Sequence, residues 1–218
     1  MFIGHFAVGL ASKRAAPKAS LGPLLAAPLL ADLLWPIFLL LGWEKVRILP
    51  VGKPLQVLEF SSYPYSHSLE MDLVWALVFA TGYWALTRYR AGAIVIFFGV
   101  LSHWVMDVIV HVPDLPLTVT GTTKVGLGLW NSVPATVAIE YLLLTLGVWL
   151  YVRTTRATDG AGRWSFRVFV AFLAVFYGMS IFAAAPPSVT ALAGGTLVLW
   201  LFPLWAWWFD RHREVAPV

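Results

Sequence analysis

The chain has 218 residues, of which 60% are hydrophobic and 12% are charged, and its mean hydropathy is +0.78. A soluble domain of this length carries about 25% charged residues, so the composition indicates an integral membrane protein. The absence of cysteine excludes disulfides and thiolate metal sites, and the net charge of +4 is spread over short segments, which argues against a nucleic-acid partner. We predict a single integral membrane domain over residues 1–218.

The first apolar segment, residues 2–12, is too short to cross a bilayer. The basic residues Lys13 and Arg14 follow this segment, whereas those of a signal peptide come first. We predict a short helix that dips into the membrane and raises His5 about 12 Å above Lys13. The alternative is an interfacial anchor that leaves His5 among the headgroups.

Longer apolar segments follow and predict an all-α, polytopic membrane helix bundle of about six spans. The second span begins near Ser66, which can cap it, after a loop that Pro50 and Pro54 interrupt. The last two spans carry almost no ionisable residues, so we expect a metal-site half at about 1–120 and a scaffold half at about 130–210. The predicted spans cover residues 21–42, 66–88, 91–111, 132–151, 164–184 and 189–209.

Basic residues between these spans predict the orientation of the chain. Eleven fall on the side of residue 13 and four on the other side, so the bias of basic residues toward the cytoplasm predicts two cytoplasmic termini. We therefore expect a multi-pass protein of a bacterial inner membrane. The eleven are Lys13, Arg14, Lys18, Arg88, Arg90, Arg153, Arg156, Arg163, Arg167, Arg211 and Arg213, and the four are Lys45, Arg47, Lys53 and Lys124.

The third span carries His103, Asp107 and His111 at four-residue spacing, which places them on one slowly drifting stripe of a helix. Ionisable groups in an apolar helix are costly unless they are paired, hydrated or bound to metal. Imidazole and carboxylate ligands suit zinc, and also manganese or iron. The alternative is a hydrogen-bonded His–Asp pair that holds helices together.

Other ionisable residues fall at compatible depths. Asp32 is eleven residues into the first span, close to the depth of His103, and His67 precedes Glu70 by three positions. Glu140 lies well inside the fourth span, as a ligand, an acid or base, or a hydrogen-bond partner. These positions predict one polar pocket that opens outward.

Four short motifs follow one another along the first half of the chain: GH at 4–5, the aspartate of the first span, SHS at 66–68 and LSHWVMD at 101–107. Together they resemble the bacterial YdjM-like family of membrane-bound metal-dependent hydrolases. The order of these residues is also similar to the ligand order of zinc-dependent phospholipase C and P1-type nucleases. The resemblance implies metal ligands at His5, Asp32, His67, His103 and Asp107, with Asp107 as a bridge and the amino-terminal amine as a further ligand.

The chain departs from these families in two ways. Its first span lacks the acidic PDxD doublet of YdjM-like sequences, and the chain lacks an evident later His-x-x-x-Glu pair that would bind a third ion. We therefore expect one or two divalent ions, with zinc favoured over manganese or iron. The expected activity is hydrolysis of a lipid or lipid-linked phosphoester, with Glu70, Glu140 or His111 as proton carrier. The alternatives are an ion- or proton-coupled transporter and a non-catalytic membrane protein stabilised by metal.

Overall fold

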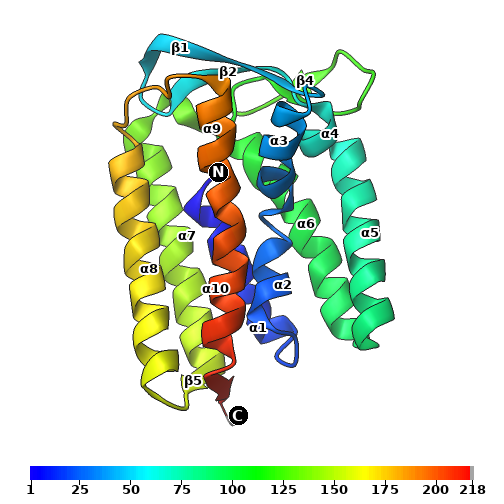
Figure 1. The fold of residues 1–218 in the computed structure, drawn as a ribbon, viewed down its shortest axis with the longest axis vertical. Coiled ribbons are helices and arrows are strands. Elements are labelled where there is room, and N and C mark those ends of the chain that lie inside the picture. Colours follow the sequence, from blue (N-terminus) through cyan, green and yellow to red (C-terminus); the bar gives the residue numbers. More distant parts are fainter. Residues whose placement is uncertain (217–218) are drawn as a thin grey trace.

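Long helices run between the two ends of the molecule in the computed structural model, which describes residues 1–216 (Figure 1). Helices make up 67% of the chain, which confirms the predicted all-α class. The upper end carries a β-hairpin, and the lower end carries the ribbon next to the carboxyl terminus. Residues 217 and 218, which belong to the predicted domain, lie outside this description.

Within residues 1–216, four helical segments are long and apolar enough to cross a membrane. They are α5 (Leu69–Thr87), α6 (Arg90–Val110), α7 (Val133–Thr154) and the continuous run of α9 (Val189–Thr196), η2 (Leu197–Trp200) and α10 (Leu201–Asp210). The other two predicted spans are not among these four. Helix α8 (Gly160–Ser180) is long enough but not apolar enough, and the first predicted span is not one continuous helix. The structure thus supports four candidate spans.

The first predicted span is broken into α2 (Leu21–Ala26) and α3 (Leu30–Leu40). Pro28 lies in the turn between the two helices, where its missing N–H and its ring interrupt a regular helix. The break also connects this segment to α6, because the Pro28 carbonyl accepts a hydrogen bond of 2.8 Å from Nδ1 of His103.

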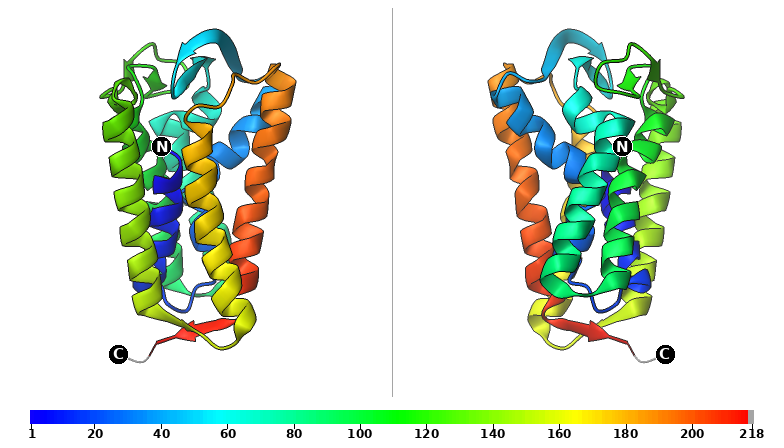
Figure 2. Two further views of the ribbon diagram at one scale, coloured as in Figure 1. Left: turned by 90° about the vertical axis from the view of Figure 1, so that its left-hand side faces the viewer. Right: turned by 90° about the vertical axis from the view of Figure 1, so that its right-hand side faces the viewer.

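Helix α1 (Ile3–Ala15) lies inside the bundle, so that the amino terminus is surrounded by other helices (Figure 2). Every residue from 3 to 10 except Val8 is buried. Gly147 of α7 allows the close approach, because a Cβ atom there would lie 2.5 Å from the carbonyl oxygen of Ala7. Helix α1 is therefore a core element of the fold.

The lower end of α1 is held by a buried ion pair. Lys13 donates to Asp210 at 2.7 Å and to the carbonyl of Ala19 at 2.8 Å. The same carboxylate accepts hydrogen bonds from Tyr151 and from the backbone N–H of Leu21. Lys13 thus lies at the end of the molecule that carries most of the basic residues, as predicted, but its side chain is buried in an ion pair with Asp210.

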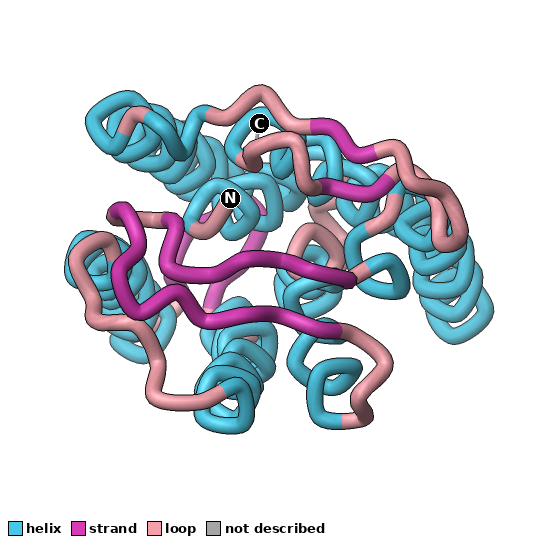
Figure 3. Tube along the Cα trace, turned by 90° about the horizontal axis from the view of Figure 1, so that it is seen from above, coloured by secondary structure: helices cyan, strands magenta, loops and turns pink. Residues whose placement is uncertain are grey.

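A β-hairpin crosses the upper end of the bundle (Figure 3). It consists of β1 (Lys45–Lys53) and β2 (Gln56–Ser62), and was predicted only as a loop. The short α4 (Pro64–His67) follows, and α5 begins three residues later than predicted, with Ser68 as its cap instead of Ser66. The remaining elements are β3 (Leu115–Pro116) paired with β4 (Lys124–Val125), η1 (Leu129–Asn131), and β5 (Thr155–Ala157) paired with β6 (Arg213–Val215).

Candidate metal centre

Helix α6 supplies the centre of the site with His103 and Asp107, which are one turn apart and buried. Nε2 of His103 lies 3.3 Å from Oδ2 of Asp107. Because the Pro28 carbonyl can only accept, Nδ1 of His103 carries the ring proton and Nε2 presents its lone pair toward the site. Such a second contact orients the metal-binding histidines of known sites.

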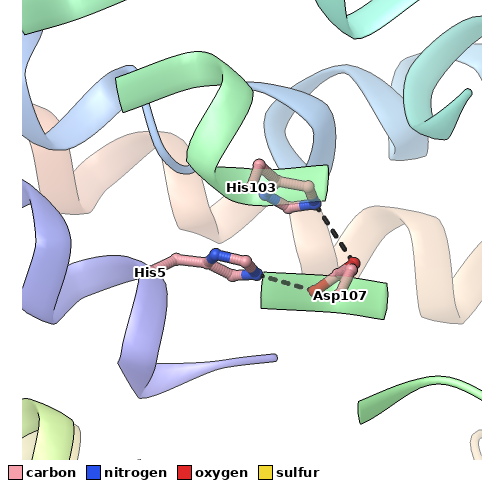
Figure 4. A group of neighbouring side chains, drawn as sticks. All are labelled: His5, His103 and Asp107. Carbon is pink, nitrogen blue, oxygen red and sulfur yellow. Dashed lines mark hydrogen bonds and ion pairs between the residues drawn. The ribbon is translucent and has the colours of Figure 1, made fainter. Parts of the chain in front are cut away.

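Helix α1 brings His5 to the same carboxylate (Figure 4). Nε2 of His5 lies 3.0 Å from Oδ1 of Asp107, and the His5 and His103 rings stack with centroids 4.0 Å apart. The amine of Met1 donates to the same oxygen, and Nε2 of His111 lies 3.4 Å from the other one. Four nitrogen groups therefore surround one buried carboxylate.

A second group joins Asp32 of α3 to His67 of α4, with 3.6 Å between Oδ1 and Nε2. Nδ1 of His67 is 2.6 Å from the Ser66 hydroxyl, which donates to Glu44 at 2.7 Å. This chain places the His67 proton on Nδ1 and leaves Nε2 free for a ligand. Burial raises the pKa of Glu44 to about 7, against the hydrogen bonds from Ser66.

The two groups fit a divalent metal ion. One comprises His5, His103 and Asp107 and the other Asp32, His67 and His103, and within each group the candidate ligand atoms all lie within 4.8 Å of one another. Tetrahedral zinc with ligands at about 2.1 Å needs about 3.4 Å between ligand atoms, close to the separations given above. Within residues 1–216, Nε2 of His103 has no hydrogen-bond partner, as expected of a ligand atom.

His103 belongs to both groups, which limits how ions can be shared. Its Nδ1 is committed to Pro28, so its Nε2 serves one ion only. The site could therefore hold one ion through His103, and a second ion would depend on the other four residues. Asp107 would be the residue shared between two ions, because its two oxygens face different histidines.

The three predicted proton carriers lie in different environments. Glu140 is buried and accepts backbone N–H groups of Phe2 and Gly4 at 2.8 and 2.7 Å, so it caps the amino-terminal end of α1. Glu70 is exposed, accepts from the backbone of Val119 and does not line the cavity, which argues against its predicted role. His111 lines the cavity, with Nδ1 2.8 Å from Asp114.

The contacts that hold the candidate ligand histidines in place were not predicted from the sequence. Ser66 was interpreted only as a helix cap, and Glu44 lies 22 residues before it in an apparent loop. The SHS motif contained a signal, because serines beside a ligand histidine are well placed to bind its second nitrogen. Asp72 was not among the predicted site residues either, although its carboxylate is buried without a hydrogen-bond partner in the described chain.

A cavity of about 720 Å³ extends from the centre. Its polar end is formed by the ionisable lining residues Asp32, His67, Asp107, His111 and Glu140. The hairpin contributes Leu58 and Phe60, and the predicted scaffold half contributes most of the other apolar lining, from α8, α9 and η2. The two predicted halves thus share one site.

Comparisons of the chain with protein-family models, with curated proteins and with solved structures found no match.

Proposed function

We propose that this protein is a membrane-embedded, metal-dependent hydrolase that acts on a lipid-linked phosphoester. The observation that carries the proposal is the convergence of five histidine and aspartate side chains from four separate helices at one end of a large cavity. A buried set of this kind is costly without compensation, and a divalent ion supplies it.

Zinc suits the ligand set best, and manganese or iron also suits imidazole and carboxylate. A bound divalent ion activates water and stabilises negative charge on a phosphoryl oxygen. The ligands are His5, Asp32, His67, His103 and Asp107, and the contacts from Pro28 and from the Ser66–Glu44 pair orient two of them.

We assign proton transfer to His111. Its ring lines the cavity, and the contact of 2.8 Å between Nδ1 and Asp114 orients it, so Nε2, which lies 3.4 Å from Asp107, is the nitrogen that can exchange a proton with a bound substrate. Glu140 is less suited, because both of its oxygens are occupied by the backbone of α1.

The proposed location is a bacterial inner membrane, with both termini in the cytoplasm. The lower end of the bundle carries eleven basic and three acidic residues, which supports this orientation. Exposed arginines there lie over tryptophan rings, a pairing suited to a membrane interface. The pairs are Arg88–Trp84, Arg153–Trp149, Arg167–Trp164 and Arg211–Trp207.

The resemblance to YdjM-like hydrolases and to the ligand order of phospholipase C belongs to this proposal and supplies the phosphoester class. The site lies beside a cavity with apolar walls, which favours a substrate attached to a lipid. Nucleic acid is not a proposed partner, because eleven of the fifteen basic residues are at the end opposite to the hairpin that covers the cavity.

The test is turnover by purified protein in lipid nanodiscs, with zinc present and with a chelator. A soluble chromogenic phosphodiester and a phospholipid serve as substrates. We expect hydrolysis that the chelator abolishes, that Asp107→Asn loses, and that the exposed control Asp159→Asn retains. Metal binding without turnover of any phosphoester would favour the non-catalytic alternative, and substrate transport without hydrolysis would favour the transporter.

A further inference from the structure

The cavity beside the metal centre has a polar end and a long apolar part. Its apolar walls come from α8, with Phe172, Phe176 and Tyr177, and from η2, with Val198 and Leu199. A site for a small soluble phosphoester would not need these walls, because the ionisable groups occupy one end. The apolar part of the cavity therefore fits a second, apolar portion of a ligand.

This cavity opens sideways through the wall of the bundle. Phe172 and Phe176 line it and are also 45% and 46% exposed, and Val198 on the other side is 52% exposed. Residues that line a cavity and are half exposed on the perimeter of apolar helices mark its mouth. The mouth lies between α8 and the run formed by α9 and η2.

Aromatic contacts close the cavity below this mouth. The Phe169 and Phe202 rings lie 6.0 Å apart, and the Phe172 and Phe202 rings lie 5.8 Å apart, which joins α8 to α10. Above the mouth, Leu58 and Phe60 of the hairpin line the cavity. Access is therefore at the level of the apolar helices, where a bilayer presents hydrocarbon chains.

Helix α9 leaves room along this path. Ala191 and Gly195 line the cavity, and no atom lies within 4 Å of a Cβ placed on Gly195. Gly194 also has open space around a Cβ, but it does not line the cavity. The two neighbouring glycines thus allow the same substitution to be made inside and outside the path.

We propose that the cavity binds a hydrocarbon chain of a membrane lipid, which enters between α8 and α9–η2 while the phosphate of the same lipid reaches the histidine and aspartate cluster. The assignment of the phosphate rests on the proposed function. The site for the hydrocarbon chain is inferred independently, from the mouth between the helices, the apolar walls and the continuity of the cavity with its polar end.

The experiment uses the full chain in nanodiscs that contain a phospholipid with a photoactivatable acyl chain, followed by peptide mapping of the labelled residues. We expect labelling of Phe176 and Val198 above the level at Leu77, an exposed apolar residue of α5 outside the cavity. Gly195→Phe should reduce labelling of the cavity residues by about tenfold, because added bulk fills the path. Gly194→Phe should leave labelling unchanged.

Ala191→Phe obstructs the same cavity without replacing a glycine, so its effect does not include the change in helix propensity that replacement of a glycine brings. It should reduce the labelling of the cavity residues as Gly195→Phe does. Labelling of Phe176 at the level of Leu77, or equal labelling of the Gly195→Phe and Gly194→Phe variants, would overturn the proposal. Asp107→Asn should keep the labelling, which separates chain binding from chemistry.

The two proposals fail differently. Specific labelling without turnover of any phosphoester supports chain binding and contradicts the proposed function. Turnover of the soluble phosphodiester with labelling that is uniform around the bundle contradicts chain binding and leaves the hydrolase in place.

Discussion

Substitution of Gly147 by alanine tests whether the buried position of α1 builds the site. A Cβ at residue 147 would lie 2.5 Å from the carbonyl oxygen and 2.7 Å from the Cα of Ala7. These are backbone atoms of α1, so no side chain can rotate to relieve the clash. Helix α1 carries His5 two residues before Ala7, and the effect must therefore reach the proposed metal centre.

The size of the effect follows from the distances. Ordinary contact begins near 3.4 Å, so α1 must move away from α7 by about 0.9 Å. A functional site tolerates displacements of about 0.5 Å, and the contact of 3.0 Å between His5 and Asp107 lies directly on the displaced helix. Overpacking of this kind costs about 1–3 kcal/mol of the free energy of unfolding.

The matched control is Gly82→Ala in α5, where a Cβ meets no atom within 4 Å. We expect this control to be neutral or stabilising by up to about 1 kcal/mol, since alanine is the better helix former. Thermal unfolding in detergent and the bound metal per chain are measured for both variants. Equal stability and equal metal content in the two variants would refute the reasoning.

Further predictions concern the surroundings of the site and the orientation of the chain. Glu44→Gln should weaken zinc affinity about 10–100-fold, as measured by competition with a chelator, because it disturbs the contact that orients His67; an unchanged affinity would exclude this role. Asp210→Asn should lower the free energy of unfolding by about 3–5 kcal/mol, since it leaves Lys13 buried and unpaired, and a change below 1 kcal/mol would contradict the buried pair. The chain has no native cysteine, so Lys124→Cys should react with an impermeant reagent added outside intact cells and Arg167→Cys should not, whereas the reverse pattern would invert the proposed orientation.

Some features of the site could be predicted because they depend on local geometry. Four-residue spacing places His103 and Asp107 on one face of any helix, and the structure has their facing atoms 3.3 Å apart. The short segment 2–12 was predicted to carry His5 inward, and its ring stacks on His103. The four-residue spacing was sufficient in the first case, and the length of the apolar segment together with the basic residues after it was sufficient in the second.

Other features depend on contacts between distant segments. The break at Pro28 is compatible with a kinked continuous helix until the carbonyl it frees is seen to bond His103, 75 residues away. The hairpin turns at Pro54 and Leu55, and Leu55 has a φ of 66°, an unusual conformation that no sequence rule assigns to leucine. Glu44 was overlooked for the same reason, since only the fold brings it to Ser66.

The most direct test of the central claim is the metal content of the purified protein, measured by elemental analysis after exposure to zinc and removal of free metal. We predict at least one divalent ion per chain in the wild type and in the control His212→Ala, whose histidine pairs with Asp159 near the lower end. The His103→Ala variant should hold at least one ion fewer per chain, because one ion depends on Nε2 of His103. A wild-type protein without metal, or a His103→Ala variant with full occupancy, would contradict the metal centre.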